Sequence, residues 1–198
     1  MQRSMAWNFY PLERNLVLQG AYIDAHMDAL ISQTRMAMQA KLYYVALMTS
    51  LAIPDIAGAL SAEDGHSSQA KYIDWYEKWV RPRLAENRGR ENPFSGQACY
   101  WFRCSMLHEG SSQDPRSRSH RIIFIEPGAP NYSIHYCLIG NEALLIQLDA
   151  FVEEVVSGCA LWLKSTRGTE PYEKNFGRFA ARHPNGLPPY VVGVPVVG

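Results

Sequence analysis

The chain has 198 residues, 19 acidic and 19 basic side chains, and a hydrophobic fraction of 47% that includes 12% aromatic residues. This length and composition exclude disorder over most of the chain and favour a single domain, residues 1–198, that buries its core without disulfides. A net charge of zero argues against nucleic-acid binding through bulk electrostatics, although local arginine clusters can still bind phosphate.

The longest apolar stretch runs from Tyr43 to Ile53, is interrupted by Thr49 and Ser50, and stops before Pro54. A bilayer-spanning helix needs about 20 apolar residues, so we expect no membrane segment and no membrane partner. The N-terminus MQRSMAWNFYPLERN lacks the compact apolar block of a secretory signal. The sequence therefore predicts a cytoplasmic protein.

The cysteines and histidines are too scattered along the chain to form a disulfide framework or a zinc site. Three of the cysteines have apolar neighbours, and we expect buried thiols in a reducing compartment. We predict no metal and no cofactor. The four cysteines are Cys99, Cys104, Cys137 and Cys159.

The first predicted element is a long amphipathic helix, because residues 22–50 carry apolar side chains at helical intervals. We expect this helix to kink or stop before Pro54, whose ring excludes the carbonyl of the preceding turn. A short helix over residues 54–60 and a polar loop over residues 61–66 follow.

The next predicted helix begins at a serine cap, Ser67 or Ser68, and ends at Pro82. Its aromatic side chains recur at helical spacing, which is typical of a face that packs into the core. That face comprises Tyr72, Ile73, Trp75, Tyr76, Trp79 and Val80.

A polar loop at residues 84–93 separates that helix from another capped one. Ser95 is a typical N-cap residue, and apolar side chains continue to Leu107. Gly110 follows at the position where a left-handed residue ends a helix. Residues 111–119 are rich in serine and arginine, and we predict a mobile surface loop.

The second half is predicted to contain one β-hairpin and one long helix. Residues 121–126 and 133–139 are rich in β-branched and aromatic side chains, which predicts the hairpin, and residues 142–163 have helical periodicity. Residues 169–198 form an extension whose apolar end needs cover on the domain or on a partner subunit. The expected fold class is mainly α, a helical bundle with a β-hairpin inserted at about residues 121–139.

The best candidate for chemistry is the pair Arg103 and His108, a permanent cation and a titratable base near the end of an otherwise apolar helix. An offset of five residues places them about 140° apart around a regular helix, so they are not expected to form a close pair on one helical face. They can line one cavity if the helix end opens at Gly110. They can also meet their symmetry copies across a two-fold axis.

This arginine and histidine, separated by four residues at the end of a helix, resemble the signature of the HEPN superfamily. The resemblance covers the motif and the helical order around it, roughly half of the chain. Members of that superfamily are commonly metal-independent endoribonucleases that act as dimers. The resemblance implies a HEPN-like bundle, a homodimer, RNA as substrate, a role as toxin, phage-defence effector or RNA processor, and an antitoxin or other regulatory protein as a further partner.

The same resemblance implies roles for the two residues. His108 would act as the general base that takes the proton of an RNA 2′-hydroxyl, since histidine titrates near neutral pH. Arg103 would hold the phosphate and offset the charge that grows in the transition state. The products would be a 2′,3′-cyclic phosphate and a 5′-hydroxyl, and DNA would not be cut because it lacks the attacking group.

Neighbouring residues would support the site, namely Cys104, Ser105 and Glu109. The residue after the arginine is usually polar in the family, whereas a cysteine stands here. Cys104 lies four residues before His108 and so on its helical face, where a thiol can orient the imidazole only weakly. Gly110 occupies the position of a tyrosine that is nucleotidylated in some HEPN toxins, so that control is not implied.

Two arginine clusters flank the segment and are expected to guide RNA. The alternative is solvated loop charge that Glu86 and Glu91 partly neutralise. The RNA-binding candidates are Arg81, Arg83, Arg88 and Arg90 on one side and Arg116 and Arg118 on the other.

The competing hypothesis is a non-catalytic HEPN-like helical module that binds RNA, a nucleotide or a partner protein. In that case Arg103 and His108 would pair with Glu109, Asp114 or a backbone carbonyl and tie the helix end to a loop. A serine-hydrolase site is disfavoured because no acid stands at a matching spacing from Ser105. A thiolate–imidazole pair is also disfavoured because its surroundings are apolar.

Overall fold

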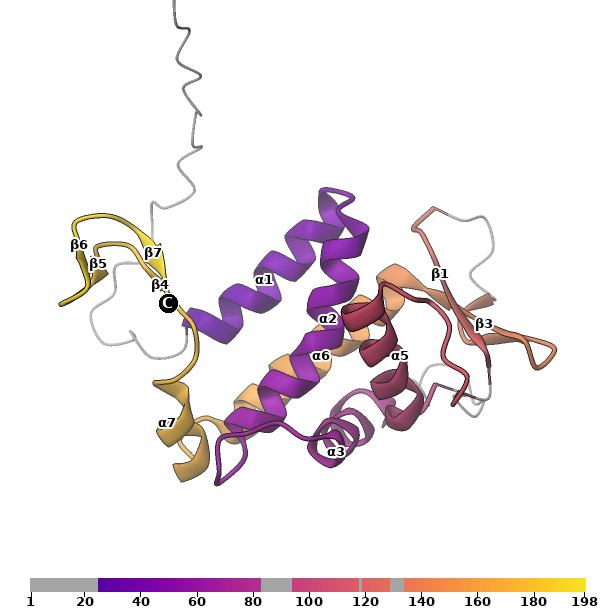
Figure 1. Ribbon diagram of the computed structural model, residues 1–198, viewed down its shortest axis with the longest axis horizontal. Helices are drawn as coiled ribbons and strands as arrows, with labels where there is room; N and C mark the ends of the chain where they lie inside the picture. The colour runs from indigo at the N-terminus through magenta and orange to yellow at the C-terminus, as the bar shows by residue number, and fades with distance from the viewer. Residues whose placement is uncertain (1–24, 83–93, 118, 129–133) are drawn as a thin grey trace, which may run out of the picture.

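The computed structural model describes residues 25–82, 94–117, 119–128 and 134–198, and the predicted mainly α class is confirmed (Figure 1). The helices are α1 Ala25–Gln39, α2 Tyr43–Leu60, α3 Gln69–Trp79, α5 Gly96–Glu109, α6 Leu148–Thr166 and α7 Glu170–Phe176. The strands are β1 Arg121–Ile125, β2 Cys137–Ile139, β3 Ala143–Gln147, β4 Arg182–His183, β5 Gly186–Leu187, β6 Val191–Val192 and β7 Val196–Val197.

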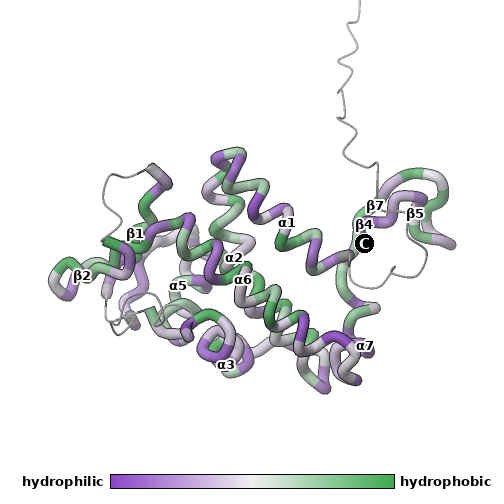
Figure 2. The backbone as a smooth tube through the Cα atoms, turned by 180° about the vertical axis from the view of Figure 1, so that it is seen from behind, coloured by the Kyte–Doolittle hydropathy of each residue, from purple (hydrophilic) through white to green (hydrophobic). Residues whose placement is uncertain are grey.

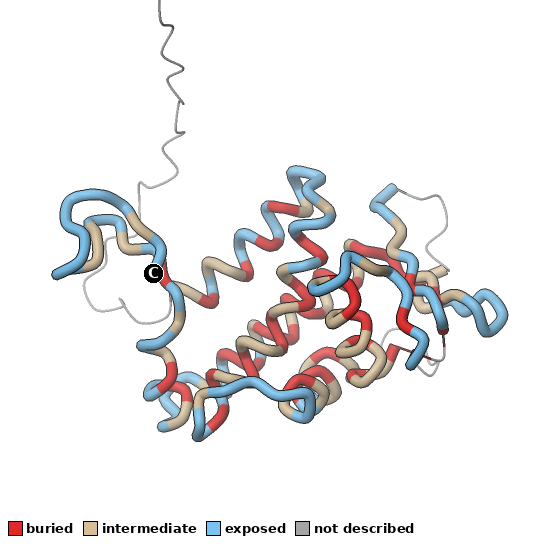
Figure 3. Tube along the Cα trace, in the orientation of Figure 1, coloured by how far each residue is buried: buried red, intermediate tan, exposed pale blue. Residues whose placement is uncertain are grey.

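Helix α2 lies at the centre of the fold and contacts α1, α3, α5, α6 and α7. Its side chains Leu51, Ile53 and Ala57 are fully buried, and Figure 3 shows buried residues along α2 and α6 where the helices meet. Among the described residues, α2 is the one helix long and apolar enough to cross a bilayer, with 50% of it buried inside the structure. Because α2 packs against five helices of its own chain, its apolar composition is that of a core helix.

The first helix is shorter than predicted. It ends at Gln39, and Lys41 adopts a left-handed conformation with φ of 58° that turns the chain before α2. The Leu42 amide bonds back to the Ala37 carbonyl across this turn at 2.8 Å. A non-glycine residue in this conformation has no clear sequence signal, so the prediction of one helix over residues 22–50 was wrong.

The prediction that a separate short helix begins at Pro54 was also wrong, because α2 continues through this proline to Leu60. An internal proline costs a helix about 3 kcal/mol. Pro54 is itself buried, and burial of the neighbouring Leu51 and Ile53 offsets that cost. The helix therefore persists for tertiary reasons that local propensity does not contain.

The predicted caps of the next two helices are confirmed. Ser68 Oγ accepts a hydrogen bond from the Lys71 amide at 3.3 Å, and Ser95 Oγ accepts one from the Ala98 amide at 3.2 Å. Gly110 is left-handed, with φ of 65°, and ends α5. The predicted loop at residues 84–93 lies outside the described residues.

The sheet differs from the predicted hairpin. Strand β3 lies in the middle of a three-stranded sheet, parallel to β1 and antiparallel to β2. Residues 143–147, assigned from the sequence to the start of a helix, form β3, and α6 begins only at Leu148. A short apolar run fits either element by periodicity, and here pairing with β1 determines the outcome.

The C-terminal extension has two parts. Its first part packs on the domain, since Tyr172 is fully buried and Asn175 Nδ2 donates to the Ala62 carbonyl at 2.6 Å. Its second part, β4 to β7, pairs with itself at the end of the molecule opposite the β1–β3–β2 sheet (Figures 1 and 2). Val192 and Val197 are 73% and 76% exposed there, so the cover expected for the apolar end is not found among the described residues.

Helices α3 and α6 approach closely at Gly158, where an added Cβ would lie 2.6 Å from the Trp79 carbonyl oxygen. We expect Gly158→Ala to lower the free energy of unfolding by about 1–3 kcal/mol, because backbone cannot move as easily as a side chain. Urea denaturation measures this loss. Gly177→Ala is the control, since Gly177 has φ of −63° and open space around it, and its variant should match the parent. Equal stability of both variants would contradict the close contact.

Candidate functional site

Arg103 and His108 are in direct contact at the end of α5. Arg103 Nη1 lies 3.2 Å from His108 Nε2, so the expectation that they would not form a close pair was wrong. The arginine side chain is long enough to reach around the helix to its last turn. A guanidinium has only donors, and His108 Nε2 must therefore be the acceptor and carry no proton in this arrangement.

Asp55 of α2 holds the other side of the guanidinium. Its Oδ2 lies 2.5 Å from Arg103 Nη2, and the two side chains are only 17% and 20% exposed. The Ser67 hydroxyl donates to Asp55 Oδ1 at 2.7 Å. The acid partner of Arg103 is therefore Asp55, rather than the Glu109 or Asp114 considered from the sequence.

Sequence reasoning missed Asp55, although one signal was present. Asp55 is the single charged residue among the 18 residues of α2. A lone carboxylate in an otherwise apolar core helix needs a partner, because an unpaired buried charge is costly. The sequence could have indicated that a partner exists, but only the packing of α2 against α5 identifies Arg103.

The guanidinium stays charged despite its burial. Burial works against the charge, but the Asp55 carboxylate and the Cys104 thiol more than offset it, and the pKa of Arg103 is raised. Two buried atoms, Arg103 Nε and Asp55 Oδ2, have no partner in hydrogen-bonding geometry within the described structure. The pair is therefore close but imperfectly aligned, which leaves Arg103 with unused capacity to donate hydrogen bonds.

Cys104 contacts Arg103, whereas the sequence placed it on the helical face of His108 and predicted that it would hold the imidazole only weakly. Arg103 Nη1 lies 3.9 Å from Cys104 Sγ. Burial and a hydrogen bond with Cys104 raise the pKa of the nearby Tyr100 hydroxyl. The thiol thus belongs to the surroundings of the guanidinium.

Ser105 anchors the loop that follows α5. Its hydroxyl donates to Asp114 Oδ2 at 2.9 Å, and Arg116 binds the same carboxylate through two nitrogens at 2.9 and 2.5 Å. Asp114, Ser117 and Ser119 are at most 7% exposed. The loop predicted at residues 111–119 is therefore tied to α5 through Asp114, while Ser112, Gln113 and Arg116 lie exposed at the surface as expected.

This anchored loop brings one predicted RNA-binding residue toward the site. The Arg116 guanidinium lies over the Trp101 ring at 5.8 Å from its centroid. Its pKa is raised, mainly by the hydrogen bonds to Asp114 and further by Cys104 and the exposed Glu109. Arg116 and Glu109 are therefore within electrostatic range of each other at the end of α5.

The described structure does not place the other predicted RNA-binding arginines beside Arg103 and His108. Arg81 pairs with Glu77 one turn earlier on α3, at 2.7 Å. Four candidates lie outside the described residues, namely Arg83, Arg88, Arg90 and Arg118.

The cysteines are free, and two of the three expected buried thiols are found. Cys99 and Cys159 are buried, and burial raises the pKa of each to about 12, whereas Cys104 is half-buried and Cys137 is exposed. In the part of the chain that the structure describes, no three histidine, cysteine or acidic side chains come together as metal ligands.

No family model, curated protein or solved structure matches the chain.

The Asp114 carboxylate should make stability depend on acid pH. Its pKa is lowered from 3.8 to about 2, chiefly by hydrogen bonds from Arg116. A lowered pKa stabilises the fold at pH values above about 4, by about 2 kcal/mol, and this contribution is lost as the pH falls through about 2.

We therefore expect Asp114→Asn to be less stable than the parent at pH 7, with a difference that shrinks toward pH 2. Urea unfolding at several pH values measures this. Asp74→Asn is the control, since the exposed Asp74 makes no ion pair among the described residues. A difference between Asp114→Asn and the parent that does not change with pH would contradict the assignment.

Proposed function

We propose that this chain is a metal-independent endoribonuclease of HEPN type, with a HEPN-like bundle as its scaffold. The observation that carries the proposal is the contact of 3.2 Å between Arg103 and His108 at the end of α5. A phosphate-binding cation next to an imidazole that can act as a base is the combination that RNA cleavage by internal attack requires. Asp55 holds the cation in place, and this contact also supports the proposal.

The contact also suggests how the base becomes available. In the unliganded arrangement the Nε2 lone pair of His108 accepts a hydrogen bond from Arg103. An RNA phosphate is a stronger acceptor for the guanidinium than a neutral ring nitrogen is, so phosphate binding would draw Nη1 away. The lone pair of His108 is then free beside the bound phosphate.

The chemical step follows from that position. His108 Nε2 takes the proton from the 2′-hydroxyl, whose oxygen attacks the neighbouring phosphorus. The bond from phosphorus to the 5′ oxygen breaks, and that oxygen takes up a proton from the imidazolium or from water. Arg103 offsets the extra negative charge on the phosphate oxygens during the transfer.

Asp55 acts as a positioning residue in this scheme. It holds Arg103 from the α2 side, so that Nη1 projects toward His108. A preformed guanidinium loses less side-chain entropy when it binds the phosphate. Ser67 in turn fixes the carboxylate.

The proposed localisation, oligomeric state and partners follow from the resemblance to the HEPN superfamily. We propose a cytoplasmic homodimer in which two copies of the site face one RNA, with Arg116 among the residues that contact its backbone. An antitoxin or other regulatory protein would restrain a toxin or phage-defence activity of this kind.

The first test is cleavage of a single-stranded RNA in the presence of a chelator. His108→Ala should lower the rate by about 10²–10⁴-fold because the general base is lost, and Arg103→Ala by about 10²–10³-fold because charge stabilisation is lost. Gel analysis of end-labelled RNA, with identification of the cyclic phosphate, measures both. The matching DNA should stay intact.

Two controls keep this test specific. His120→Ala removes an exposed histidine outside the proposed site and should cleave RNA like the parent. Arg103→Lys keeps a positive charge beside Asp55, so this variant shows whether the loss in Arg103→Ala comes from a disrupted fold. Circular dichroism checks that each variant is folded. Cleavage that persists in folded His108→Ala protein would end the proposal.

A second test concerns Asp55. Asp55→Asn keeps an oxygen for Ser67 but weakens the hold on Arg103, and we expect about 10–100-fold slower cleavage. In the double variant Asp55→Asn/Arg103→Ala the loss should be no greater than in Arg103→Ala alone, because Asp55 acts through Arg103. Independent, multiplying losses would refute a positioning role. Asp64→Asn, which breaks an exposed ion pair with Lys71, should leave the rate unchanged.

One observation favours a second candidate function, the non-catalytic helical module that binds RNA, a nucleotide or a partner protein. The Arg103 side chain is 20% exposed and already paired with Asp55, an arrangement that also suits a structural strut. A folded parent protein that binds RNA but leaves it uncut would support this candidate.

A further inference from the structure

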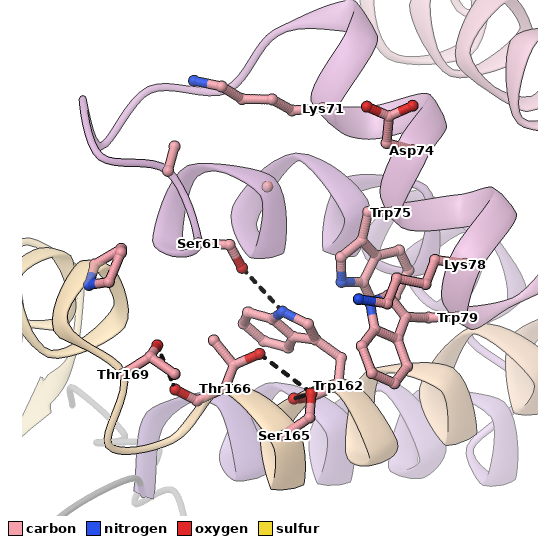
Figure 4. Close-up of a pocket in the computed structure, with 13 residues that line it drawn as sticks. Ser61, Lys71, Asp74, Trp75, Lys78, Trp79, Trp162, Ser165, Thr166 and Thr169 are labelled. Atoms are coloured by element: carbon pink, nitrogen blue, oxygen red, sulfur yellow. Dashed lines mark hydrogen bonds between the residues drawn. The ribbon is translucent and has the colours of Figure 1, made fainter.

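We infer that a second site on this chain binds a nucleotide, in a pocket formed where α3 faces the ends of α2 and α6. The pocket has a volume of about 640 Å³, within the range of small-molecule sites. Figure 4 shows its walls: Ser61 after α2, a row of side chains on α3, and Trp162 on α6. The inference is independent of the proposed ribonuclease activity, since none of the residues Asp55, Arg103 and His108 lines this pocket.

Three indole rings supply the apolar surface of the pocket. Trp75 and Trp162 are 5% and 2% exposed and meet edge to face with centroids 6.3 Å apart. Trp162 Nε1 donates to Ser61 Oγ at 3.0 Å, which fixes the orientation of its ring. Trp79 is half-buried and presents the third ring. Fixed aromatic walls of this kind favour a flat ligand that can stack.

Two charges at the rim are available to a ligand. The Lys78 ammonium lies over the Trp79 ring, 4.9 Å from its centroid, and Asp74 stands one helical turn earlier on α3. Neither makes an ion pair with any residue that the structure describes. The ammonium of Lys71, in contrast, is already used by Asp64 Oδ1 and the His66 carbonyl, each at 2.7 Å.

A third polar group lacks a partner. Trp75 Nε1 is buried and has no acceptor within the described structure. A buried donor without an acceptor costs about 1–3 kcal/mol, and an acceptor on a ligand would recover part of that cost.

These features together select the ligand class. Stacking on indoles requires a flat ring, and Trp75 requires a ring acceptor atom. Asp74 requires a donor such as an exocyclic amine, and Lys78 requires an anion. A nucleobase with its phosphate meets all four, whereas a neutral sugar leaves Lys78 unused and an aliphatic ligand leaves both Trp75 and Asp74 unused. The nucleotide can be free or can be one unit of an RNA strand.

Isothermal titration calorimetry of the full-length protein tests the inference with AMP, GMP, guanosine and a short 2′-O-methyl oligonucleotide that cannot be cleaved. We expect saturable binding of at least one nucleotide. Lys78→Gln should weaken nucleotide binding about tenfold and leave guanosine unaffected, because only the nucleotide carries the anion. Trp75→Phe should weaken both by about 5–30-fold through loss of the N–H donor.

The controls and outcomes separate the two sources of ligand. Lys164→Gln removes a lysine outside the pocket and should leave mononucleotide binding unchanged. Saturable mononucleotide binding that depends on Trp75 and Lys78 supports a free nucleotide, and the same dependence seen only with the oligonucleotide supports a unit of an RNA strand.

Binding by neither ligand, or binding that Lys78→Gln and Trp75→Phe leave unchanged, overturns the inference. Lys78 is exposed, so its variant is expected to fold even if Trp75→Phe does not. Calorimetric titration of the His108→Ala variant with nucleotide distinguishes the two proposals. This variant should lose RNA cleavage but still bind nucleotide in the pocket.

Discussion

The arrangement of the candidate site depends on one largely buried ion pair. Two opposite charges, each about four-fifths removed from water, are tolerated in a helical core only because they neutralise each other. Asp55 comes from the central helix and Arg103 from α5, so their pairing fixes how α5 lies against α2. The position of His108 follows from that constraint, since it lies on the same helix within reach of the guanidinium.

Two adjacent serines join this ion pair to the rest of the fold. Ser67 donates to Asp55, and Ser68 caps α3, which carries two of the three tryptophans of the pocket. Lys71 on the first turn of that helix binds back to the Asp64 side chain and the His66 carbonyl. The turn between α2 and α3 therefore contributes one residue to the ion pair and the cap of the helix that lines the pocket.

Local sequence signals were sufficient where the structure is locally determined. The serine caps of α3 and α5 and the glycine that ends α5 follow from side-chain chemistry within one turn, and they are found as predicted. Pro54 and residues 143–147 were misassigned because burial in α2 and pairing with β1 decided them. Such effects depend on residues far away in the sequence.

The same distinction applies to the site. Arg103 and His108 were found because their spacing within one helix is visible in the sequence. Asp55 was not, because its partner is 48 positions away, and only packing brings them together. The anchoring of the loop at residues 111–119 was missed for the same reason, because the contacts of Asp114 with Ser105 and Arg116 depend on how the chain folds back onto α5.

The last long helix has a consequence for how the protein is made. Arg35 binds Glu153, and Trp162 binds Ser61, across 118 and 101 residues of sequence. Closure of the core must therefore wait until most of the polypeptide has left the ribosome, and pairing at such sequence distance is slow. During that interval the apolar side of α2 has no α6 to cover it, so the emerging chain exposes a surface that is prone to aggregation.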